Sequence, residues 1–343
     1  MNFHYINEAQ KANWEHMVSG NSANGFMQSF FWAEFKRLMG WDTFKIGAFN
    51  KEQLLGGAII HKFNFSKTKN FLYIPEGPVL PYKDDKKSEA VFHALIGEID
   101  KIVDLKGPAL TTHLRIDPHL TSKPRHFAHF RKSPFNMQPK STIMVDLKQS
   151  EEKILAGMKP KCRYNIKIAE RNNIIVTHSL SAVNISAFIV LYNETVRRNK
   201  FEAKSNAYFN ALFAMIKKYG CGDVFIASCN GSPLAAALVI FYGRRATYFF
   251  GASSSQKRQK MAPNLLHWEI IRHAQKHGFA WYDFWGVAPN KDDTEHGWYG
   301  LSQFKKKFGG TQFDYIGAYD FIYNEKLYRE FLKESGELKM PHS

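Results

Sequence analysis

The chain has 343 residues, of which 44% are hydrophobic and 15% aromatic, so it is too apolar to be disordered and long enough for two domains. Its net charge of +16 suits a polyanionic partner such as nucleic acid, a nucleotide-linked molecule or anionic lipid, although a basic solvated surface is the plainer interpretation. Three cysteines, with no metal-ligand spacing, argue against a disulfide or zinc framework. Because no apolar run approaches the roughly 18 residues that span a bilayer, we expect a cytoplasmic protein.

The first half of the chain begins with a helix that ends at Gly40, followed by a strand, a turn at Asn50 and a second strand over residues 46–60. An apolar strand, FLYIP, and a turn, EGP, come next. A periodic helix over residues 88–105 and a strand, TTHLRI, complete the series.

The second half repeats this order of elements. A helix ends at Gly220, and residues 226–240 again read as strand, turn and strand. The turn residues Asn50 and Asn230 are 180 positions apart. A strand (YFFGAS), a helix (PNLLHWEIIRHAQKHG) and a strand (AWYDFWGV) follow, so the sequence indicates an internal duplication.

A hairpin followed by strand, helix and strand predicts a mixed sheet with a helix on its face, so we expect each half to be α/β. This order resembles the GCN5-related N-acetyltransferases, which implies two tandem domains of that fold. The offset leaves the terminal strand in FDYIGAYDFIY without a first-half counterpart. We therefore expect residues 1–147 and 312–343 to form one domain and residues 148–311 the other.

The segment MKPKCRYNIKIAERNNI predicts an amphipathic helix with Pro160 in its first turn. Arg163, Lys167 and Arg171 recur every four residues and would form one basic stripe. The opposite, core-facing side is expected to hold Ile166, Ala169 and Ile174. Such a stripe can follow a phosphate backbone, or it can be only a solvated helix face.

This segment also resembles the K-x-R-Y-N-I-x-x-A-x-R/K signature of the Fem (FemABX) transferases. Further matches in family order, over nearly the whole chain, are FMQSFFWAEFKRLMGW, YIPEGPV, LRIDP, YFFGASS, PNLLHWEIIRHAQKHGFAWYDFWG and GLSQFKKKFGG. Members contain two acetyltransferase-like domains and move an amino acid from aminoacyl-tRNA to the side-chain amine of a peptidoglycan precursor peptide. Because AYFNALFAMIKKYG leads directly into the second hairpin, the resemblance implies a short member without the coiled-coil arm that some members carry.

The reaction implied by the resemblance needs no cofactor, because an aminoacyl ester is already activated. It requires two anionic substrates to be held together, an amine to lose a proton and a tetrahedral oxyanion to be stabilised. The resemblance places Lys305 at that oxyanion and Asp117 at the acceptor substrate. On the residues alone, Lys305 is one of three exposed lysines and Asp117 is a turn former before proline.

The resemblance implies further binding residues for the precursor. Lys36 corresponds to a lysine that binds the nucleotide diphosphate. Lys204 and Tyr208 stand where the family commonly has arginine and tyrosine, and lysine lacks the bidentate fork of arginine. Phe250 stands where tyrosine is frequent. The other expected substrate-binding residues are Arg37, Gly77, Pro78 and Phe304.

The basic stripe and the turn before the second-half helix are the expected tRNA contacts. These residues are Arg163, Lys167, Arg171, Lys257, Arg258 and Lys260. That turn, SSSQKRQKMAPN, has no glycine of the kind that holds coenzyme A pyrophosphate in acetyltransferases.

Asp283 and Gly286, at the end of a second-half strand, are further site candidates. His273 and His277 lie four apart without a third ligand, so we expect no metal site.

Two other classes of function remain open: a coenzyme A-dependent N-acyltransferase on the same fold, and a non-catalytic basic RNA-binding module. The enzyme interpretation itself leaves two acceptors, a UDP-linked or a lipid-linked muramyl pentapeptide. A lipid-linked acceptor would bring the protein to the anionic inner face of the membrane as a peripheral protein. We expect a monomer in either case.

Overall fold

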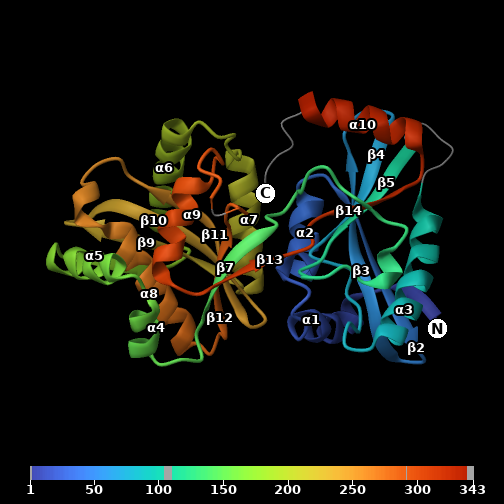
Figure 1. The fold of residues 1–343 in the computed structure, drawn as a ribbon, viewed down its shortest axis with the longest axis horizontal. Coiled ribbons are helices and arrows are strands. Elements are labelled where there is room, and N and C mark those ends of the chain that lie inside the picture. Colours follow the sequence, from blue (N-terminus) through green and yellow to red (C-terminus); the bar gives the residue numbers. More distant parts are fainter. Residues whose placement is uncertain (1, 104–109, 291, 338–343) are drawn as a thin grey trace. The chain divides into compact units, whose positions relative to one another are not determined.

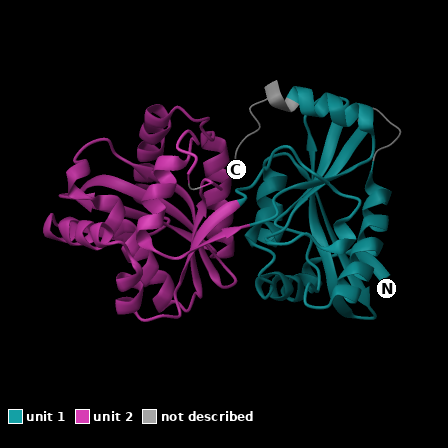
Figure 2. Cartoon of the chain, viewed as in Figure 1, with its two compact units in different colours: residues 1–140, 315–343 teal, residues 141–314 magenta. Residues whose placement is uncertain are grey.

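The computed structural model describes residues 2–103, 110–290 and 292–337. The chain divides into two compact units, which Figure 2 shows in different colours. Unit 1 consists of Met1–Lys140 and Tyr315–Ser343, and unit 2 is Ser141–Asp314. Each unit is built around one seven-stranded sheet with helices packed on it (Figure 1).

The sheet of unit 1 has the order β1-β2-β3-β4-β5-β14-β6. β4 and β5 are parallel, and every other neighbouring pair is antiparallel. The strands are β1 (Asn2–Tyr5), β2 (Asp42–Asn50), β3 (Gln53–Asn64), β4 (Lys69–Pro75), β5 (Leu110–Asp117), β6 (Arg131–Lys132) and β14 (Tyr319–Ile322).

Helices cover both faces of this sheet. The helices of unit 1 are α1 (Lys11–Ser19), α2 (Phe30–Leu38), α3 (Asp85–Ile99) and α10 (Glu325–Glu337), with short 3₁₀ turns at Glu8–Gln10, Phe26–Gln28, Asp100–Ile102 and Arg125–Phe127. Side chains of β4 alternate between the faces: Leu72 and Ile74 pack in the core with α3, whereas Phe71 and Tyr73 pack with Phe331 of α10. The helix predicted over 88–105 corresponds to α3 and the turn after it, and residues 104 and 105 lie outside the described residues.

The sheet of unit 2 has the order β13-β7-β12-β11-β10-β9-β8. Again one central pair, β11 and β12, is parallel and the others are antiparallel. The strands are β7 (Ser141–Asp146), β8 (Ile174–His178), β9 (Gly222–Cys229), β10 (Ser232–Tyr242), β11 (Arg245–Ser253), β12 (Trp281–Gly286) and β13 (Thr311–Asp314).

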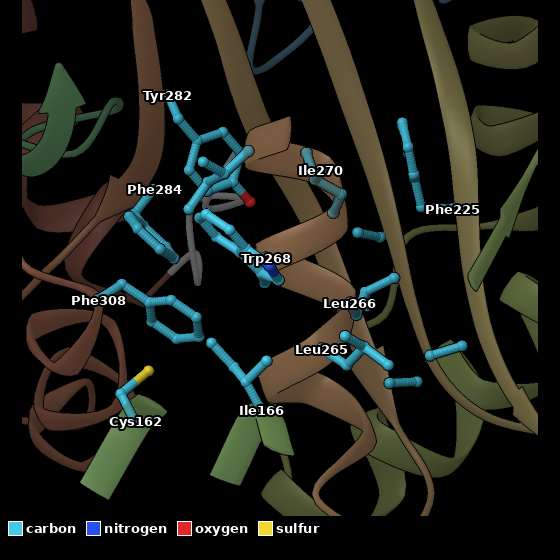
Figure 3. Close-up of a cluster of buried hydrophobic side chains, with 14 of the residues drawn as sticks. Cys162, Ile166, Phe225, Leu265, Leu266, Trp268, Ile270, Tyr282, Phe284 and Phe308 are labelled. Atoms are coloured by element: carbon cyan, nitrogen blue, oxygen red, sulfur yellow. The ribbon is translucent and has the colours of Figure 1, made fainter. Parts of the chain in front are cut away.

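The main core of unit 2 lies between its sheet and α8. Figure 3 shows part of it, with Tyr282 and Phe284 of β12 and Phe308 next to side chains of α8 such as Trp268. α5 packs against α8, while α6 packs on β10 and β11. The helices are α4 (Glu151–Gly157), α5 (Pro160–Arg171), α6 (Ala182–Asn199), α7 (Asn206–Tyr219), α8 (Ala262–Lys276) and α9 (Tyr299–Lys305), with 3₁₀ turns at Arg258–Lys260 and Lys306–Phe308. Among the described residues, no helix has the length and apolarity needed to cross a bilayer.

The two sheets have equivalent strand orders, in which the hairpin β2-β3 corresponds to β9-β10 and the parallel pair β4-β5 to β11-β12. The predicted fold class, two α/β domains from an internal duplication, agrees with this architecture. One step of the sequence argument was wrong, because the terminal strands do have counterparts: β6 and β13 begin 180 positions apart, and β7 and β14 begin 178 apart.

The two halves exchange their last strands, so β7 joins the sheet of unit 2 and β14 joins the sheet of unit 1. Residues 141–147 and 312–314, which the sequence assigned to the first domain, therefore belong to unit 2. Residues 1 and 338–343, which the sequence also assigned to the first domain, lie outside the described residues.

Candidate active site

The parallel strands of unit 2 diverge part-way along. The pairing of β11 with β12 ends at Thr247 and Asp283, although both strands run on, β11 beside β10 and β12 beside β7. In unit 1, by contrast, β4 and β5 stay paired to their last residues, Pro75 and Asp117. Unit 2 thus contains a fork between β11 and β12 at the centre of its sheet.

Lys305, the last residue of α9, lies at this fork. Its Nζ donates a hydrogen bond to Gly286 O at the end of β12 (2.7 Å) and lies 5.6 Å from the ring centroid of Tyr248 on β11. The side chain is buried, and burial lowers the pKa of Lys305 to about 7, although the carboxylate of Asp283 opposes this shift. Near neutral pH, Lys305 is therefore able to act either as an ammonium or as an amine.

Several aromatic side chains and a neutral histidine lie beside the lysine. His267 of α8 is buried, its Nδ1 lies 2.7 Å from Tyr282 Oη, and its ring contacts that of Tyr248 at 4.5 Å. Burial lowers the pKa of His267 to about 3, and the charge of Lys305 adds to this shift, so His267 is neutral at physiological pH. Phe304 packs its ring on His267, with the centroids 5.5 Å apart.

The structure brings Asp283 and Gly286 together with Lys305. Asp283 is buried, and its Oδ1 accepts hydrogen bonds from Trp285 N (2.8 Å) and from the hydroxyl of Thr142 on β7. Three of the residues chosen from sequence therefore form one buried polar group.

A second group of expected residues lies on the α6 and α7 side of β11. Lys204 Nζ is 5.4 Å from the ring centroid of Tyr208, and that ring lies 6.1 Å from Phe250. Tyr192 of α6 contacts Phe250 as well, at 6.0 Å. Burial lowers the pKa of Lys204. The structure thus brings Lys204, Tyr208 and Phe250 together, whereas Lys305 lies beside Tyr248 of the same strand as Phe250.

In unit 1, Asp117 ends β5 as a buried carboxylate. Its Oδ2 accepts a hydrogen bond from Tyr73 Oη (2.5 Å) and its Oδ1 from the backbone N–H of Glu76 (2.8 Å). Burial raises the pKa of Asp117 to about 7, and the Glu76 carboxylate contributes to the rise. The group therefore changes its charge close to physiological pH.

The turn that contains Gly77 and Pro78 lies beside Asp117. Asn24 Nδ2 donates to Glu76 O (2.7 Å) and to Pro78 O (3.0 Å), which fixes the turn. A Cβ at position 77 would come within 2.8 Å of the Gln28 side chain, so glycine is needed for this close approach. Gly77 and Pro78 thus directly follow Glu76, whose backbone N–H binds the Asp117 carboxylate.

Lys36 lies in a different part of unit 1, on α2. Its Nζ is 4.6 Å from the ring of Trp41 and 5.0 Å from that of Trp32, an arrangement that holds the ammonium by cation–π attraction. Lys36 is half-buried, whereas Arg37 is exposed.

The structure confirms that Pro160 lies in the first turn of α5. Lys167 and Arg171 are exposed, but Arg163 differs from the expectation. Its guanidinium is half-buried and donates hydrogen bonds to Met158 O and, at 3.4 Å, to a carbonyl of α4. Because Arg163 caps the end of α4, the open part of the stripe consists of Lys167 and Arg171.

The basic residues of the glycine-free turn before α8 also differ in their exposure to solvent. Lys257 and Arg258 are exposed, whereas Lys260 is half-buried and donates to Cys229 Sγ at 3.1 Å. Lys257 and Met261 adopt left-handed backbone conformations with φ of 52° and 56°. Two non-glycine residues of this turn thus adopt a backbone conformation that favours glycine.

Several polar residues of these sites were not singled out from the sequence: the buried Tyr73, Glu76, Thr142 and His267, and the half-buried Tyr248. Four of them lie in motifs that carry the resemblance, so these motifs were the available signal: Tyr73 and Glu76 in YIPEGPV, Tyr248 in YFFGASS and His267 in PNLLHWEIIRHAQKHGFAWYDFWG. Within residues 2–103, 110–290 and 292–337, no group of three or more His, Cys, Asp or Glu side chains is placed to hold a metal ion. His277 instead bonds through Nδ1 to His273 O at 2.7 Å.

Comparison with known proteins gives one family. The model of the FemAB family matches residues 10–124, 111–230 and 214–332. A lipid II:glycine glycyltransferase of Staphylococcus haemolyticus is 22% identical, over 92% of this chain and 93% of the relative. The crystal structure of FemX matches with a TM-score of 0.83 at 20% identity, over 96% of this chain and 99% of that one. A tandem GNAT protein from the clavulanic acid biosynthesis pathway matches with a TM-score of 0.55 at 10% identity, over 93% and 97%. These structures confirm the predicted tandem acetyltransferase-like fold.

Proposed function

The chain belongs to the FemAB family, as its motifs indicated, and from this membership we propose that it transfers an amino acid from aminoacyl-tRNA to a peptidoglycan precursor. The acceptor is the side-chain amine of the diamino acid in the precursor pentapeptide, and the product serves cell-wall cross-bridge synthesis. The name of the relative, lipid II:glycine glycyltransferase, supports both the aminoacyl group and the cell-wall acceptor.

The observation that carries this proposal is the buried Lys305 at the fork of β11 and β12. Hydrogen-bond donors fixed in a water-poor site stabilise developing negative charge far better than solvated ones. An ammonium with one bond to Gly286 O has further N–H groups for an oxyanion between the strands.

The proposed reaction is an aminolysis of an ester. The acceptor amine attacks the ester carbonyl, a tetrahedral oxyanion forms next to Lys305, and the ribose hydroxyl of the tRNA leaves as the amide forms. The proton that the amine loses ends on the leaving oxygen or in solvent. The acceptor binds as an ammonium that Asp117 orients, and it loses one proton to solvent before the free amine attacks. No cofactor takes part in this scheme.

The precursor-binding residues in this proposal are those that the family resemblance implies. Lys36 binds the diphosphate of the precursor, and the Lys204 cluster binds its sugar-peptide part. The other proposed precursor contacts are Arg37, Gly77, Pro78, Tyr208, Phe250 and Phe304.

Unit 2 is proposed to bind the tRNA, through exposed cations on α5 and on the turn before α8. The proposed phosphate contacts are Lys167, Arg171, Lys257 and Arg258, with Arg163 and Lys260 contributing positive potential from their half-buried positions.

We place the protein, as a monomer, in the cytoplasm at the inner membrane face. The net charge of +16 and the lipid-linked acceptor in the name of the relative support this placement.

The test is an incubation of the protein with a mixed aminoacyl-tRNA pool and either UDP-linked or lipid-linked pentapeptide, followed by mass spectrometry of the peptide. We expect the mass of the peptide to increase by that of one amino-acid residue. The size of the increase identifies the amino acid, and the precursor that shows it identifies the acceptor. A parallel arm with acetyl-CoA tests the second use of this fold, coenzyme A-dependent acylation. RNA binding without any transfer would identify a non-catalytic module instead.

A further inference from the structure

We propose that Asp283 is a positioning residue for Lys305, and that it acts by fixing a left-handed turn of β12 whose carbonyl holds the lysine side chain. This inference rests on the proposed function, since it assigns a role beside the lysine that we place at the transfer site. The residues involved come from three elements: β7, β12 and α9.

The turn itself is the first observation. The register of β12 against β7 shifts between Asp283 and Gly286, which marks a bulge. Within this bulge, Trp285 has a φ of 56°, a left-handed conformation that is rare for a large aromatic residue. Some nearby group must therefore hold Trp285 in place.

Asp283 is the group that stabilises this conformation of Trp285. The backbone N–H of Trp285 donates to Asp283 Oδ1 at 2.8 Å, closing a turn in which a carboxylate binds the backbone two residues on. The hydroxyl of Thr142 donates to the same oxygen, and Trp285 O is a second acceptor 3.2 Å from that hydroxyl. Because Thr142 and Asp283 are both buried, no solvent competes for these bonds.

The turn determines where Lys305 points. Gly286 directly follows Trp285, and its carbonyl accepts the 2.7 Å hydrogen bond from Lys305 Nζ. A change in the conformation of Trp285 would move this carbonyl and leave the buried lysine without the acceptor that orients it. Thr142 thus acts on Lys305 through Asp283, although it belongs to the strand that the first half contributes to unit 2.

Asp283 also acts on Lys305 through its charge. The titratable groups that face the lysine are Asp283 on β12, His267 on α8 and Tyr248 on β11. Burial lowers the pKa of His267 and raises that of Tyr248, so both are neutral near pH 7. Asp283 is the anion of this group, and its carboxylate favours the ammonium form of Lys305 against the effect of burial.

The test separates charge from hydrogen bonding. Asp283→Asn keeps an oxygen acceptor for Trp285 and Thr142 but removes the anion, and Thr142→Val removes the hydroxyl, with Thr142→Ser as the variant that restores it. The direct readout is the pH titration of the Lys305 ¹³Cε signal in lysine-labelled protein, assigned by its loss in Lys305→Met. Asp223→Asn, which alters a carboxylate paired with His178, is the matched control.

In Asp283→Asn, we expect the pKa of Lys305 to fall further, by about one unit or more, because the charge that raises it is gone. The alkaline limb of the pH profile of kcat/KM should move to lower pH by the same amount. Thr142→Val should lower kcat about tenfold or more with KM changed less than about twofold, and Thr142→Ser should recover most of kcat.

An unchanged Lys305 titration in folded Asp283→Asn, or equal kcat in Thr142→Val and wild type, would overturn the inference. If Asp283→Asn does not fold, the comparison of Thr142→Val with Thr142→Ser decides. Failure of wild-type protein to transfer any amino acid would refute the proposed function instead, and the NMR titration would still test the electrostatic effect of Asp283 on Lys305.

Discussion

Burial distinguishes Lys305 from its two neighbours in the run Lys305, Lys306 and Lys307. Adjacent helical side chains point about 100° apart, so only one of three can enter a common site. Lys305 is 3% exposed, while the other two are half-buried. The lysine that the resemblance placed at the oxyanion is thus the buried one. The residues alone could not predict its burial, because a run of lysines before two glycines is typical of a solvated helix end.

Replacement of Lys305 tests its role in the transition state. In Lys305→Met, we expect kcat to fall by roughly 100- to 1000-fold, as when an oxyanion donor is removed, with little change in KM for either substrate. Lys306→Met is the matched control. The measurement is steady-state kinetics with a charged minihelix and the precursor. An equal loss in Lys306→Met would refute the assignment.

The pH dependence of transfer tests Asp117. Because burial raises the pKa of Asp117 to about 7, the carboxylate that binds the acceptor ammonium is lost as the pH falls below 7. Burial lowers the pKa of Lys305 to about 7, so its ammonium is lost above that value. We therefore expect kcat/KM to have a bell-shaped pH profile with its maximum near 7.

In Asp117→Asn, the acid limb of this profile should disappear and KM for the precursor should rise, while KM for the tRNA stays constant. The measurement is kcat/KM for the precursor between about pH 5 and 9. An acid limb that persists in Asp117→Asn would assign that limb to another group.

At the scale of elements, α5 shows what a periodic pattern can and cannot predict. The pattern correctly gave the first-turn proline and the burial of Ile166 and Ala169. It could not show that Arg163 reaches the carbonyls at the end of α4, because that contact depends on how the chain turns between the two helices. Two of the three stripe residues remain exposed.

The salt dependence of tRNA binding tests this surface. Replacing Lys167 and Arg171 together by glutamine should reduce the log–log salt slope by about two units, if each residue neutralises one phosphate. The matched control replaces Lys86 and Lys87, two exposed lysines of α3, by glutamine. An unchanged slope in the first double variant would make the stripe a solvated helix face only.

For the whole molecule, the sequence predicted the duplication but not the exchange of strands. The hairpins recur at a fixed offset and are long, so their periodicity is visible. β14 has only four residues, and its pairing with β5 joins positions such as Arg115 and Asp320 that lie far apart in the chain. Short strands carry little pattern, and the choice of sheet is decided by tertiary contacts such as the buried ion pair of Arg115 with Asp320 (2.7 Å).

That ion pair predicts how unit 1 depends on its C-terminal segment. Asp320→Ala leaves the fully buried Arg115 without its bidentate partner, which should destabilise unit 1 by about 3–5 kcal/mol. Amide hydrogen exchange should then speed up in β4 and β5 but not in β10. The exposed Asp292→Ala serves as the control. Equal protection of β5 in both variants would show that β14 is not held by this pair.

The most direct test of the proposed activity is a single-turnover assay with a minihelix that carries a ¹³C-labelled amino acid and a UDP-linked or lipid-linked pentapeptide. Mass spectrometry of the pentapeptide reads the product for wild type and for Lys305→Met. We predict that wild type places the labelled residue on the side-chain amine, that Lys305→Met does so roughly 100- to 1000-fold more slowly, and that acetyl-CoA gives no product. Absence of labelled product with both precursors, or acetyl transfer from coenzyme A, would contradict the proposal.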